Sequence, residues 1–440
     1  MKTMKKLASL LLALAMIFSL ATTAFAKSID IAPPANSTGT NTYKIYKVFD
    51  ATVSDSGISY TLVDGKDTAP AGFTANNGYV TYNGTGNTLT AEDITAIASY
   101  VTDSDLVATV SSNGTAHAVA ENLDPGYYYI TTSTGSVVTI DSANDETVEV
   151  IDKNTVPTLK KEITSASSYD QDGKKALAQI GTDVEYTVTI TVGKGATNYV
   201  FHDKMGSGLT FKGNENVSVG GVNTDQYEIL TPADGDTLTI KFDDGIAAGT
   251  SITITYVATI NESALNDDPE KNTAYLSYGD GHKTTEEYTE VYNAQFTVTK
   301  KDGDGKALAG AGFVIKNADD KYYKLDENVV TWVESIDDAD EHMSITDGSV
   351  PAFIGLANGT YTLVEKTVPA GYNKADDSTF TIAEHDYTAG NLAQGAEVTN
   401  NAGTELPSTG GMGTTLFYVL GGIMVAAAVI LLVTKKRMAN

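Results

Sequence analysis

The sequence predicts an all-β protein of tandem immunoglobulin-like β-sandwich domains, with one further helix at each end of the chain. Runs rich in Thr, Val and Ile alternate apolar with polar residues, and turns containing Gly, Asn or Asp separate these runs. Long helical patterns occur only at the two termini. Closely spaced strands of this kind are typical of antiparallel sandwiches, and 440 residues suffice for about three domains.

The N-terminal helix is predicted to be a secretory signal peptide covering residues 1–26. A basic stretch, MKTMKK, precedes the short apolar run LASLLLALAMIFSL, and AFA forms a small-x-small cleavage site before Lys27. The chain is therefore expected to be exported.

The C-terminal helix is predicted to span a membrane. Leu416 to Val433 is an uncharged apolar run, about long enough to cross a bilayer. The basic tail KKR at 435–437 follows it, and the positive-inside rule places such a tail in the cytoplasm. The long middle of the chain is then outside the cell.

Directly before the span stands a short motif formed by Leu406, Pro407, Ser408, Thr409 and Gly410. Motif, span and basic tail together resemble the sorting signal of Gram-positive surface proteins, which sortase cleaves between Thr and Gly of LPXTG. The resemblance implies that the span is a temporary anchor before attachment to the cell wall. The alternative is a permanent single-pass membrane protein.

Charge and cysteine content exclude several classes of function. Removing both ends takes away six basic residues and no acid, so the formal net charge changes from −27 to −33. Such a surface repels nucleic acid and anionic membranes. The chain has no cysteine, so any covalent stabilisation must use chemistry other than disulfides.

The region between the ends divides into three segments, each opening and closing on a strand-like run. The predicted domains are residues 27–153, 154–292 and 293–401, and residues 402–440 hold a linker, the sorting motif, the helix and the tail. Segments one and three look related, because LDPGYYYITT aligns with LANGTYTLVE. That alignment places Thr132 opposite Glu365, and VEVID beside AEVTN places Asp152 opposite Asn400.

The stretch AQFTVTKKDG, at 294–303, places a lysine where a core residue is expected. Side chains in a strand alternate, so Phe296, Val298 and Lys300 share the inward face. By the same alternation, Glu365 and Asn400 also face inward. Three buried polar groups with complementary chemistry suggest a site.

Burial lowers the pKa of an amine and raises that of a carboxyl, so Lys300 becomes a neutral nucleophile and Glu365 stays protonated. A protonated Glu365 hydrogen-bonded to the Asn400 amide oxygen would polarise the carbonyl that Lys300 attacks. Ammonia leaves and an amide cross-link remains, helped by effective molarities on the order of 10⁵ M or more. The alternative is a buried salt bridge beside a satisfied asparagine.

The stretches KALAGAGFVI and YTLVEKTVPAGYN resemble the B-type domains of collagen adhesins and pilins. The resemblance implies that Lys300 is the nucleophile, Glu365 the catalytic acid and Asn400 the acceptor of an isopeptide bond.

The second segment repeats this logic and resembles the A-type pilin domain, in which Asp replaces Glu. Lys161, Asp203 and Asn272 fall on inward positions of their strands, which predicts a Lys161–Asn272 bond assisted by Asp203. If the strand register were shifted by one residue, Lys160 would face inward instead of Lys161, and the sequence leaves this choice open.

The first segment is predicted to form no cross-link. Lys44 and Lys47 are its candidate lysines, but the Thr132 hydroxyl cannot shuttle a proton as a carboxylic acid does.

The stretch VEVIDKN, at 148–154, resembles the pilin motif, with Ile151 and Asp152 in place of the usual Tyr and Pro. The resemblance implies that a pilin sortase joins Thr409 of one subunit to Lys153 of the next. The predicted function is a structural shaft subunit of a cell-wall pilus, not a turnover enzyme. The alternative is a wall-anchored adhesin or accessory pilin that is not polymerised through Lys153.

The partners implied are a pilin-polymerising sortase, a housekeeping sortase, other copies of the chain, minor pilins and peptidoglycan, with no nucleic acid. No cofactor or metal is expected, because the five histidines are scattered without ligand spacing. The loops DQDG (170–173) and DGDG (302–305) lack the twelfth-position Glu of an EF-hand and are interpreted as turns, although bound calcium stays an open alternative.

Overall fold

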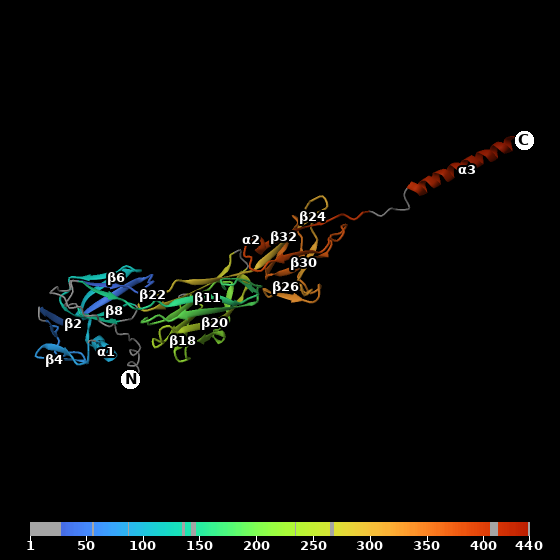
Figure 1. The fold of residues 1–440 in the computed structure, drawn as a ribbon. Helices are drawn as coiled ribbons and strands as arrows, with labels where there is room; N and C mark the ends of the chain where they lie inside the picture. The colour runs from blue at the N-terminus through green and yellow to red at the C-terminus, as the bar shows by residue number, and fades with distance from the viewer. Residues whose placement is uncertain are drawn as a thin grey trace.

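The computed structural model shows three β-sandwiches in a row, followed by a helix that projects beyond the third (Figure 1). It describes residues 28–54, 57–86, 88–133, 137–141, 147–233, 235–264, 268–404 and 412–438. The predicted class, sandwiches followed by a C-terminal apolar helix, is confirmed. The predicted signal peptide lies outside the described residues.

The first sandwich packs a three-stranded sheet against a larger one. The small sheet has the order β10-β1-β7, with β1 parallel to β10. The larger sheet has the order β4-β5-β3-β2-β8-β9, with β6 beside β2. Their bounds are β1 Ser28–Ala32, β2 Thr40–Ser54, β3 Gly57–Leu62, β4 Phe73–Asn76, β5 Tyr79–Tyr82, β6 Leu106–Asn113, β7 Ala118–Glu121, β8 Gly126–Thr132, β9 Val137–Asp141 and β10 Thr147–Ile151.

This sandwich also carries a helix that the sequence analysis did not predict, α1 (Ala91–Tyr100). Thr90 and Asp93 form a capping box at its N-terminus, in which each side chain accepts a hydrogen bond from the other residue's backbone. Ile97 is fully buried one turn later. The Thr-x-x-Asp pattern before an apolar repeat is the feature of the sequence from which this helix could have been predicted.

The second sandwich consists of two sheets, both larger than the three-stranded sheet of the first sandwich. One has the order β11-β14-β20-β16, with β17 beside β20, and the other β12-β13-β23-β21-β15-β19-β18, with β22 beside β21. Their bounds are β11 Thr158–Ser165, β12 Ser168–Tyr169, β13 Lys175–Leu177, β14 Asp183–Thr191, β15 Val200–Met205, β16 Leu209–Phe211, β17 Ser218–Gly220, β18 Tyr227–Leu230, β19 Leu238–Phe242, β20 Ser251–Ile260, β21 Glu270–Tyr278, β22 His282–Lys283 and β23 Glu287–Tyr292.

The third sandwich pairs its first strand with its last. β24 lies between β29 and β32 and runs parallel to β32. The facing sheet has the order β27-β26-β25-β30-β31, with β28 beside β25. The bounds are β24 Ala294–Asp302, β25 Gly312–Lys316, β26 Tyr322–Asp326, β27 Val329–Val333, β28 His342–Met343, β29 Ser349–Leu356, β30 Gly359–Thr367, β31 Ser378–Ile382, α2 Ala389–Leu392 and β32 Ala393–Asn400.

The second and third sandwiches share one continuous apolar core, whereas the first has separate clusters. Ile180, between β13 and β14, is fully buried at the junction, and its backbone N–H donates to the Gly355 carbonyl at 3.1 Å. The Gln179 side chain accepts from Trp332 Nε1 at 2.7 Å and donates to the Val330 carbonyl at 2.8 Å. These contacts tie the last two sandwiches into one unit.

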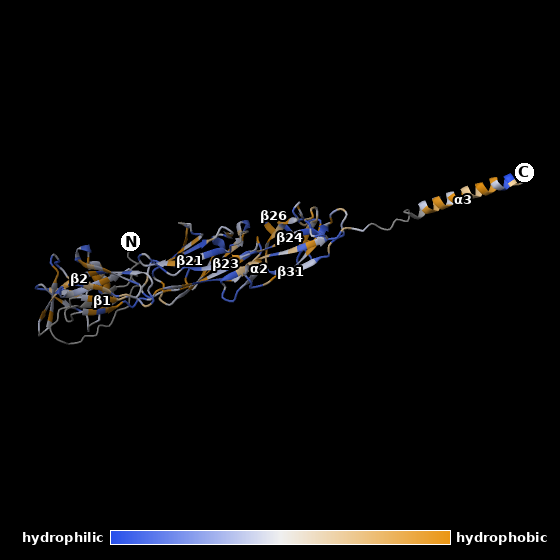
Figure 2. Cartoon of the chain, turned by 90° about the horizontal axis from the view of Figure 1, so that it is seen from above, coloured by the Kyte–Doolittle hydropathy of each residue, from blue (hydrophilic) through white to orange (hydrophobic). Residues whose placement is uncertain are grey.

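The C-terminal helix α3 (Met412–Met438) contains a stretch, Thr415–Met438, that is long and apolar enough to span a membrane. Its apolar side chains from Leu416 onward are exposed. Figure 2 colours most of the helix as hydrophobic and its C-terminal end as hydrophilic. Lys435, Lys436 and Arg437 lie in its last turn.

Candidate functional site

Lys300 is buried in the third sandwich because it continues the inward stripe of β24. Phe296 and Val298 precede it on the same face, and all three side chains are at most 2% exposed. The Lys300 amine donates to Asn400 Oδ1 at 2.6 Å and to the Val398 carbonyl at 3.1 Å. The strand alternation therefore brings a lysine amine against a carboxamide.

Asn400 and Glu365 complete this cluster from two other strands. Asn400, at the end of β32, is 1% exposed, and Glu365, on β30 of the facing sheet, is 3% exposed. Asn400 Nδ2 donates to Glu365 Oε1 at 2.7 Å, and the Ala375 backbone N–H donates to Glu365 Oε2 at 2.7 Å. The expected contact of Glu365 with the amide oxygen is therefore wrong: Glu365 meets the amide nitrogen, because the lysine amine occupies the oxygen.

The electrostatics favour an uncharged amine. Burial lowers the pKa of Lys300 below its ordinary 10.5, and the nearby Glu365 opposes that shift only in part. A neutral amine has a free electron pair, so it can act as a nucleophile toward the carbon bonded to Asn400 Oδ1.

A glycine allows a close backbone approach beside this lysine. Gly348 has φ +80°, and its carbonyl accepts a hydrogen bond from the Lys300 backbone N–H. A Cβ at this position would lie 2.4 Å from the Lys300 carbonyl oxygen. Residue 348 must therefore be glycine for β24 to keep its place.

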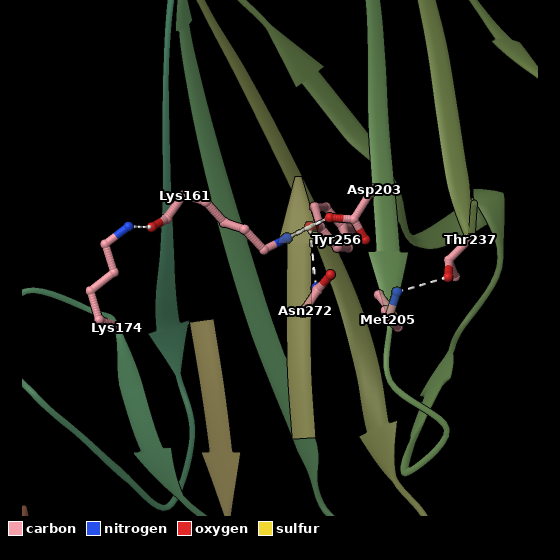
Figure 3. Close-up of polar contacts among 7 residues, drawn as sticks. All are labelled: Lys161, Lys174, Asp203, Met205, Thr237, Tyr256 and Asn272. Carbon is pink, nitrogen blue, oxygen red and sulfur yellow. Dashed lines mark hydrogen bonds and ion pairs between the residues drawn. The ribbon is translucent and has the colours of Figure 1, made fainter. Parts of the chain in front are cut away.

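The second sandwich buries a comparable cluster made of Lys161, Asp203 and Asn272, all fully inaccessible to solvent. Lys161 lies on β11, while Asp203 and Asn272 lie on the neighbouring strands β15 and β21 of the facing sheet. The Lys161 amine contacts Asp203 Oδ2 directly, as Figure 3 shows. The structure thus brings together all three residues that the strand alternation placed inward, across the two sheets.

The register that the sequence left open is decided by burial. Lys161 lies inside with Leu159 and Ile163, whereas the Lys160 side chain is 61% exposed and pairs with Glu162 at 2.7 Å. Lys174 donates to the Lys161 carbonyl at 2.8 Å and holds this part of β11 from outside (Figure 3).

Sequence reasoning missed two tyrosines in this cluster. The Tyr256 hydroxyl contacts both the Lys161 amine and Asp203 Oδ2, and it accepts a hydrogen bond from Asn272 Nδ2 at 3.4 Å. The Tyr186 ring stacks on the Tyr256 ring with centroids 5.4 Å apart. The Lys161 amine lies 5.1 Å from the centroid of the Tyr186 ring. The signal was present, since SITITYVATI and DVEYTVTIT put both tyrosines on inward positions.

Burial perturbs every ionisable group of this cluster. It lowers the pKa of Lys161, although the neighbouring Asp203 carboxylate opposes the shift. It raises the pKa of Asp203, although Lys161 and Tyr256 oppose that shift. It also raises the pKa of Tyr256 well above 10. Together these shifts favour a neutral amine beside a protonated acid.

The first sandwich places its lysines elsewhere, which corrects the choice of Lys44 or Lys47. Both lie on β2 rather than on the first strand; Lys44 is exposed, and Lys47 forms an ion pair with Asp50 at 2.6 Å. For comparison, the buried lysine of the third sandwich, Lys300, lies on the first strand of that sandwich and is paired in the sheet with Val398, two residues before Asn400.

The equivalent position in the first sandwich is an isoleucine. Ile31 pairs with Val150, two residues before Asp152. Asp152 is 5% exposed and accepts from the Tyr43 hydroxyl at 3.2 Å and from the Asn154 backbone N–H at 3.1 Å. Burial raises the pKa of Asp152. An isoleucine has no nucleophile, so this arrangement offers no amine to the carboxyl.

Lys153 is exposed between two buried neighbours at the end of the first sandwich. Asp152 and Asn154 are each 5% exposed, and the Asp152 backbone N–H donates to the Ala32 carbonyl at 2.8 Å. Thr155 then bonds to Lys194 of the second sandwich through both backbone and side chain. The buried, hydrogen-bonded residues on both sides of Lys153 therefore leave its side chain directed toward solvent.

The motif Leu406–Gly410 lies outside the described residues. Within the described parts of the chain, no group of three or more His, Cys, Asp or Glu side chains is arranged to hold a metal ion.

Two family models match the C-terminal part of the chain. Residues 294–393 match the SpaA family, described as a prealbumin-like fold domain, and residues 398–440 match the LPXTG cell wall anchor motif. Lys300 and Glu365 fall within the first match and Asn400 within the second. A search of curated protein sequences gives no significant match.

Several backbone pilins are among the solved structures to which this chain is similar. The T6 backbone pilin of Streptococcus pyogenes is 18% identical with a TM-score of 0.55, covering 83% of this chain and 81% of that one. The group B streptococcus pilus 2b backbone protein is 27% identical with a TM-score of 0.47, covering 56% and 99%. The major pilin SpaD of Corynebacterium diphtheriae is 19% identical with a TM-score of 0.49, covering 88% and 100%.

The likeness to the T6 pilin shows that the two chains share a fold. The match to the anchor motif begins within β32, the last strand of the third sandwich, and includes the apolar helix α3. The protein is thus a cell-wall-anchored surface protein that carries a SpaA-type prealbumin-like domain and an LPXTG anchor.

Proposed function

We propose that the protein is a shaft subunit of a covalent cell-surface pilus, stapled internally by two Lys–Asn isopeptide bonds. The observation that carries this proposal is a buried cluster of a lysine, an asparagine and an acid in each of two successive sandwiches. Such clusters are costly to bury unless their charges are neutralised. Condensation neutralises them permanently.

The chemistry in the third sandwich is an amide exchange. The neutral Lys300 amine attacks Asn400 Cγ, and a new C–N bond forms. Glu365, which contacts Asn400 Nδ2 at 2.7 Å, delivers a proton to that nitrogen as the old C–N bond breaks. The lysine nitrogen loses a proton, which replaces the one that Glu365 gave up, so the products are one secondary amide and one ammonia and Glu365 returns to its starting state.

The two bonds would stabilise the fold differently. Lys300 and Asn400 lie on the neighbouring parallel strands β24 and β32, so their bond would lock the first strand of the domain to the last. Lys161 and Asn272 lie on opposite sheets, so their bond would join the two layers. A pulling force could then not unzip either domain.

Polymerisation requires one exposed amine and one sorting motif in each subunit. In the proposed reaction a pilin-polymerising sortase breaks the Thr409–Gly410 bond and holds the Thr409 carbonyl as a thioester. The Lys153 amine of another subunit attacks that carbonyl, forms an amide and releases the sortase thiol. A housekeeping sortase transfers the last subunit to an amine of peptidoglycan, and minor pilins join by the same chemistry.

A wall-anchored adhesin or accessory pilin is the second candidate. The departure of Ile151 and Asp152 from the usual pilin motif favours it. Its internal bonds would be the same, but Lys153 would be an ordinary surface lysine.

Intact mass of the mature chain, residues 27–409, tests the internal bonds. The expected mass is lower than the translated mass by two ammonia equivalents, and proteolysis should release branched peptides joining Lys161 to Asn272 and Lys300 to Asn400. The plain translated mass for folded protein would refute the stapled domains.

Substitution of Lys161 by alanine is expected to restore one ammonia equivalent to the mass, because the second sandwich then has no nucleophile. Lys160→Ala is the matched control: its side chain is exposed, so both equivalents should still be lost. The reverse pattern would show that Lys160 is the residue that reacts.

The stability of an uncondensed third sandwich is expected to rise with pH. In Glu365→Gln, Lys300 remains a buried amine whose pKa lies below the unfolded value of about 10.5. Between these two pKa values the unfolded state binds more protons, so the free energy of unfolding increases with pH. Urea unfolding at pH 7 and pH 9 measures the slope.

The control for this pH dependence is the double variant Glu365→Gln with Lys300→Met. It has no buried amine, so the additional slope should disappear. An equal slope in both variants would contradict the assigned burial of a titrating lysine.

A further inference from the structure

The two clusters differ in how the acid reaches the leaving nitrogen. In the third sandwich Glu365 contacts Asn400 Nδ2 directly at 2.7 Å. In the second, the contacts of the Asp203 carboxylate go to Lys161 and Tyr256, and the Tyr256 hydroxyl is the group that meets Asn272 Nδ2, at 3.4 Å (Figure 3). Aspartate is one methylene shorter than glutamate, and the tyrosine hydroxyl fills the gap.

We propose that Tyr256 is a catalytic residue of the second sandwich, whose hydroxyl relays a proton from Asp203 to the leaving amide nitrogen of Asn272. This inference rests on the proposed Lys161–Asn272 condensation. It adds a fourth chemical group, the tyrosine hydroxyl, to the amine, the carboxamide and the acid of that site, and it makes the mechanisms of the two sandwiches different.

The surroundings of Tyr256 hold its hydroxyl in one place. Tyr256 is fully buried on β20, and Tyr186 stands directly opposite it on β14. Tyr186 stacks on one side of the ring, and Phe211 approaches edge-on with centroids 6.4 Å apart. A hydroxyl fixed in this way loses little orientational freedom when it takes part in a proton transfer.

The protonation states suit a relay. A relay group must carry a proton at the start, and burial keeps the pKa of Tyr256 well above 10. Among the described residues, Asp203 Oδ1 and Asn272 Oδ1 are buried without a hydrogen-bond partner. The site therefore retains unused acceptor oxygens until the reaction rearranges its protons.

The relay step conserves atoms and charge. The Lys161 nitrogen attacks Asn272 Cγ, and a proton from that nitrogen passes to Asp203 Oδ2, which it contacts. Tyr256 gives its hydroxyl proton to Asn272 Nδ2 and takes one from Asp203. The C–N bond to Nδ2 then breaks, ammonia leaves, and the tyrosine and the acid end in their starting states.

Tyr256→Phe in the full mature chain tests the relay. The bond in the second sandwich is expected to form at least about 100-fold more slowly, the range in which a positioned proton donor contributes. The third sandwich should condense normally, so the mass after a short expression pulse should show one lost ammonia equivalent. The matched control is Tyr186→Phe, which keeps the ring stack and removes a buried hydroxyl that, among the described residues, forms no hydrogen bond with Lys161 or Asp203.

Equal condensation rates in Tyr256→Phe and Tyr186→Phe would overturn the proposal. A wild-type chain without the Lys161–Asn272 bond would instead refute the proposed function itself, so the two failures are distinguishable.

A second measurement avoids any effect of substitution on folding. Incorporation of 3-fluorotyrosine throughout the chain lowers the pKa of the phenol with little change in shape. The condensation rate should change in the second sandwich and stay constant in the third, where the contacts of Lys300, Glu365 and Asn400 involve no tyrosine. An unchanged rate in both sandwiches would also overturn the relay.

Discussion

Replacement of Lys153 by alanine is expected to abolish the ladder of covalent polymers in cell-wall extracts. Lys153 is the exposed amine between the buried anchors Asp152 and Asn154, and without it the acyl group at Thr409 has no acceptor on the neighbouring subunit. Monomers should still reach the wall through the housekeeping sortase. Immunoblots of wall extracts measure both outcomes.

Two control variants separate charge from chemistry. Lys153→Arg keeps the positive charge but offers no amine of comparable nucleophilicity, so the ladder should also disappear. Lys160→Ala removes another exposed lysine and should leave the ladder intact. A ladder that persists in Lys153→Ala would favour the adhesin or another acceptor lysine.

Glu365→Gln is expected to leave the third sandwich folded but without its cross-link. Lys300 and Asn400 are 100 residues apart, and a cross-link closing a loop of that length stabilises by about 4.7 kcal/mol in the chain-entropy model. The second and third sandwiches share one core. At about 2–4 °C per kcal/mol for a unit of that size, the melting temperature should fall by about 10–20 °C. Differential scanning calorimetry together with intact mass measures this loss.

The matched control for that experiment is Glu397→Gln. Glu397 lies on β32 three residues before Asn400, but its side chain is 55% exposed and pairs with Lys301. Surface pairs of this kind contribute about 0–1 kcal/mol, so the cross-link and the melting temperature should persist. A Glu365→Gln chain that still loses two ammonia equivalents would show that the acid is dispensable.

The sequence by itself determined the fold class, the anchor region and the polar residues that face inward. Strand side chains alternate with period two, so Phe296 and Val298 require Lys300 to point into the core, and Leu159 with Ile163 requires the same of Lys161. These are local properties of single strands. The apolar helix is local too, since length and composition define it.

Only the tertiary structure decided what each buried group contacts. It placed the Tyr256 hydroxyl among Lys161, Asp203 and Asn272, and it set Glu365 against the nitrogen of Asn400 rather than the oxygen. It also put Ile31, not Lys44 or Lys47, at the first-sandwich position equivalent to Lys300. Contacts of this kind depend on which strands are neighbours and in what register, and residues far apart in the chain determine both.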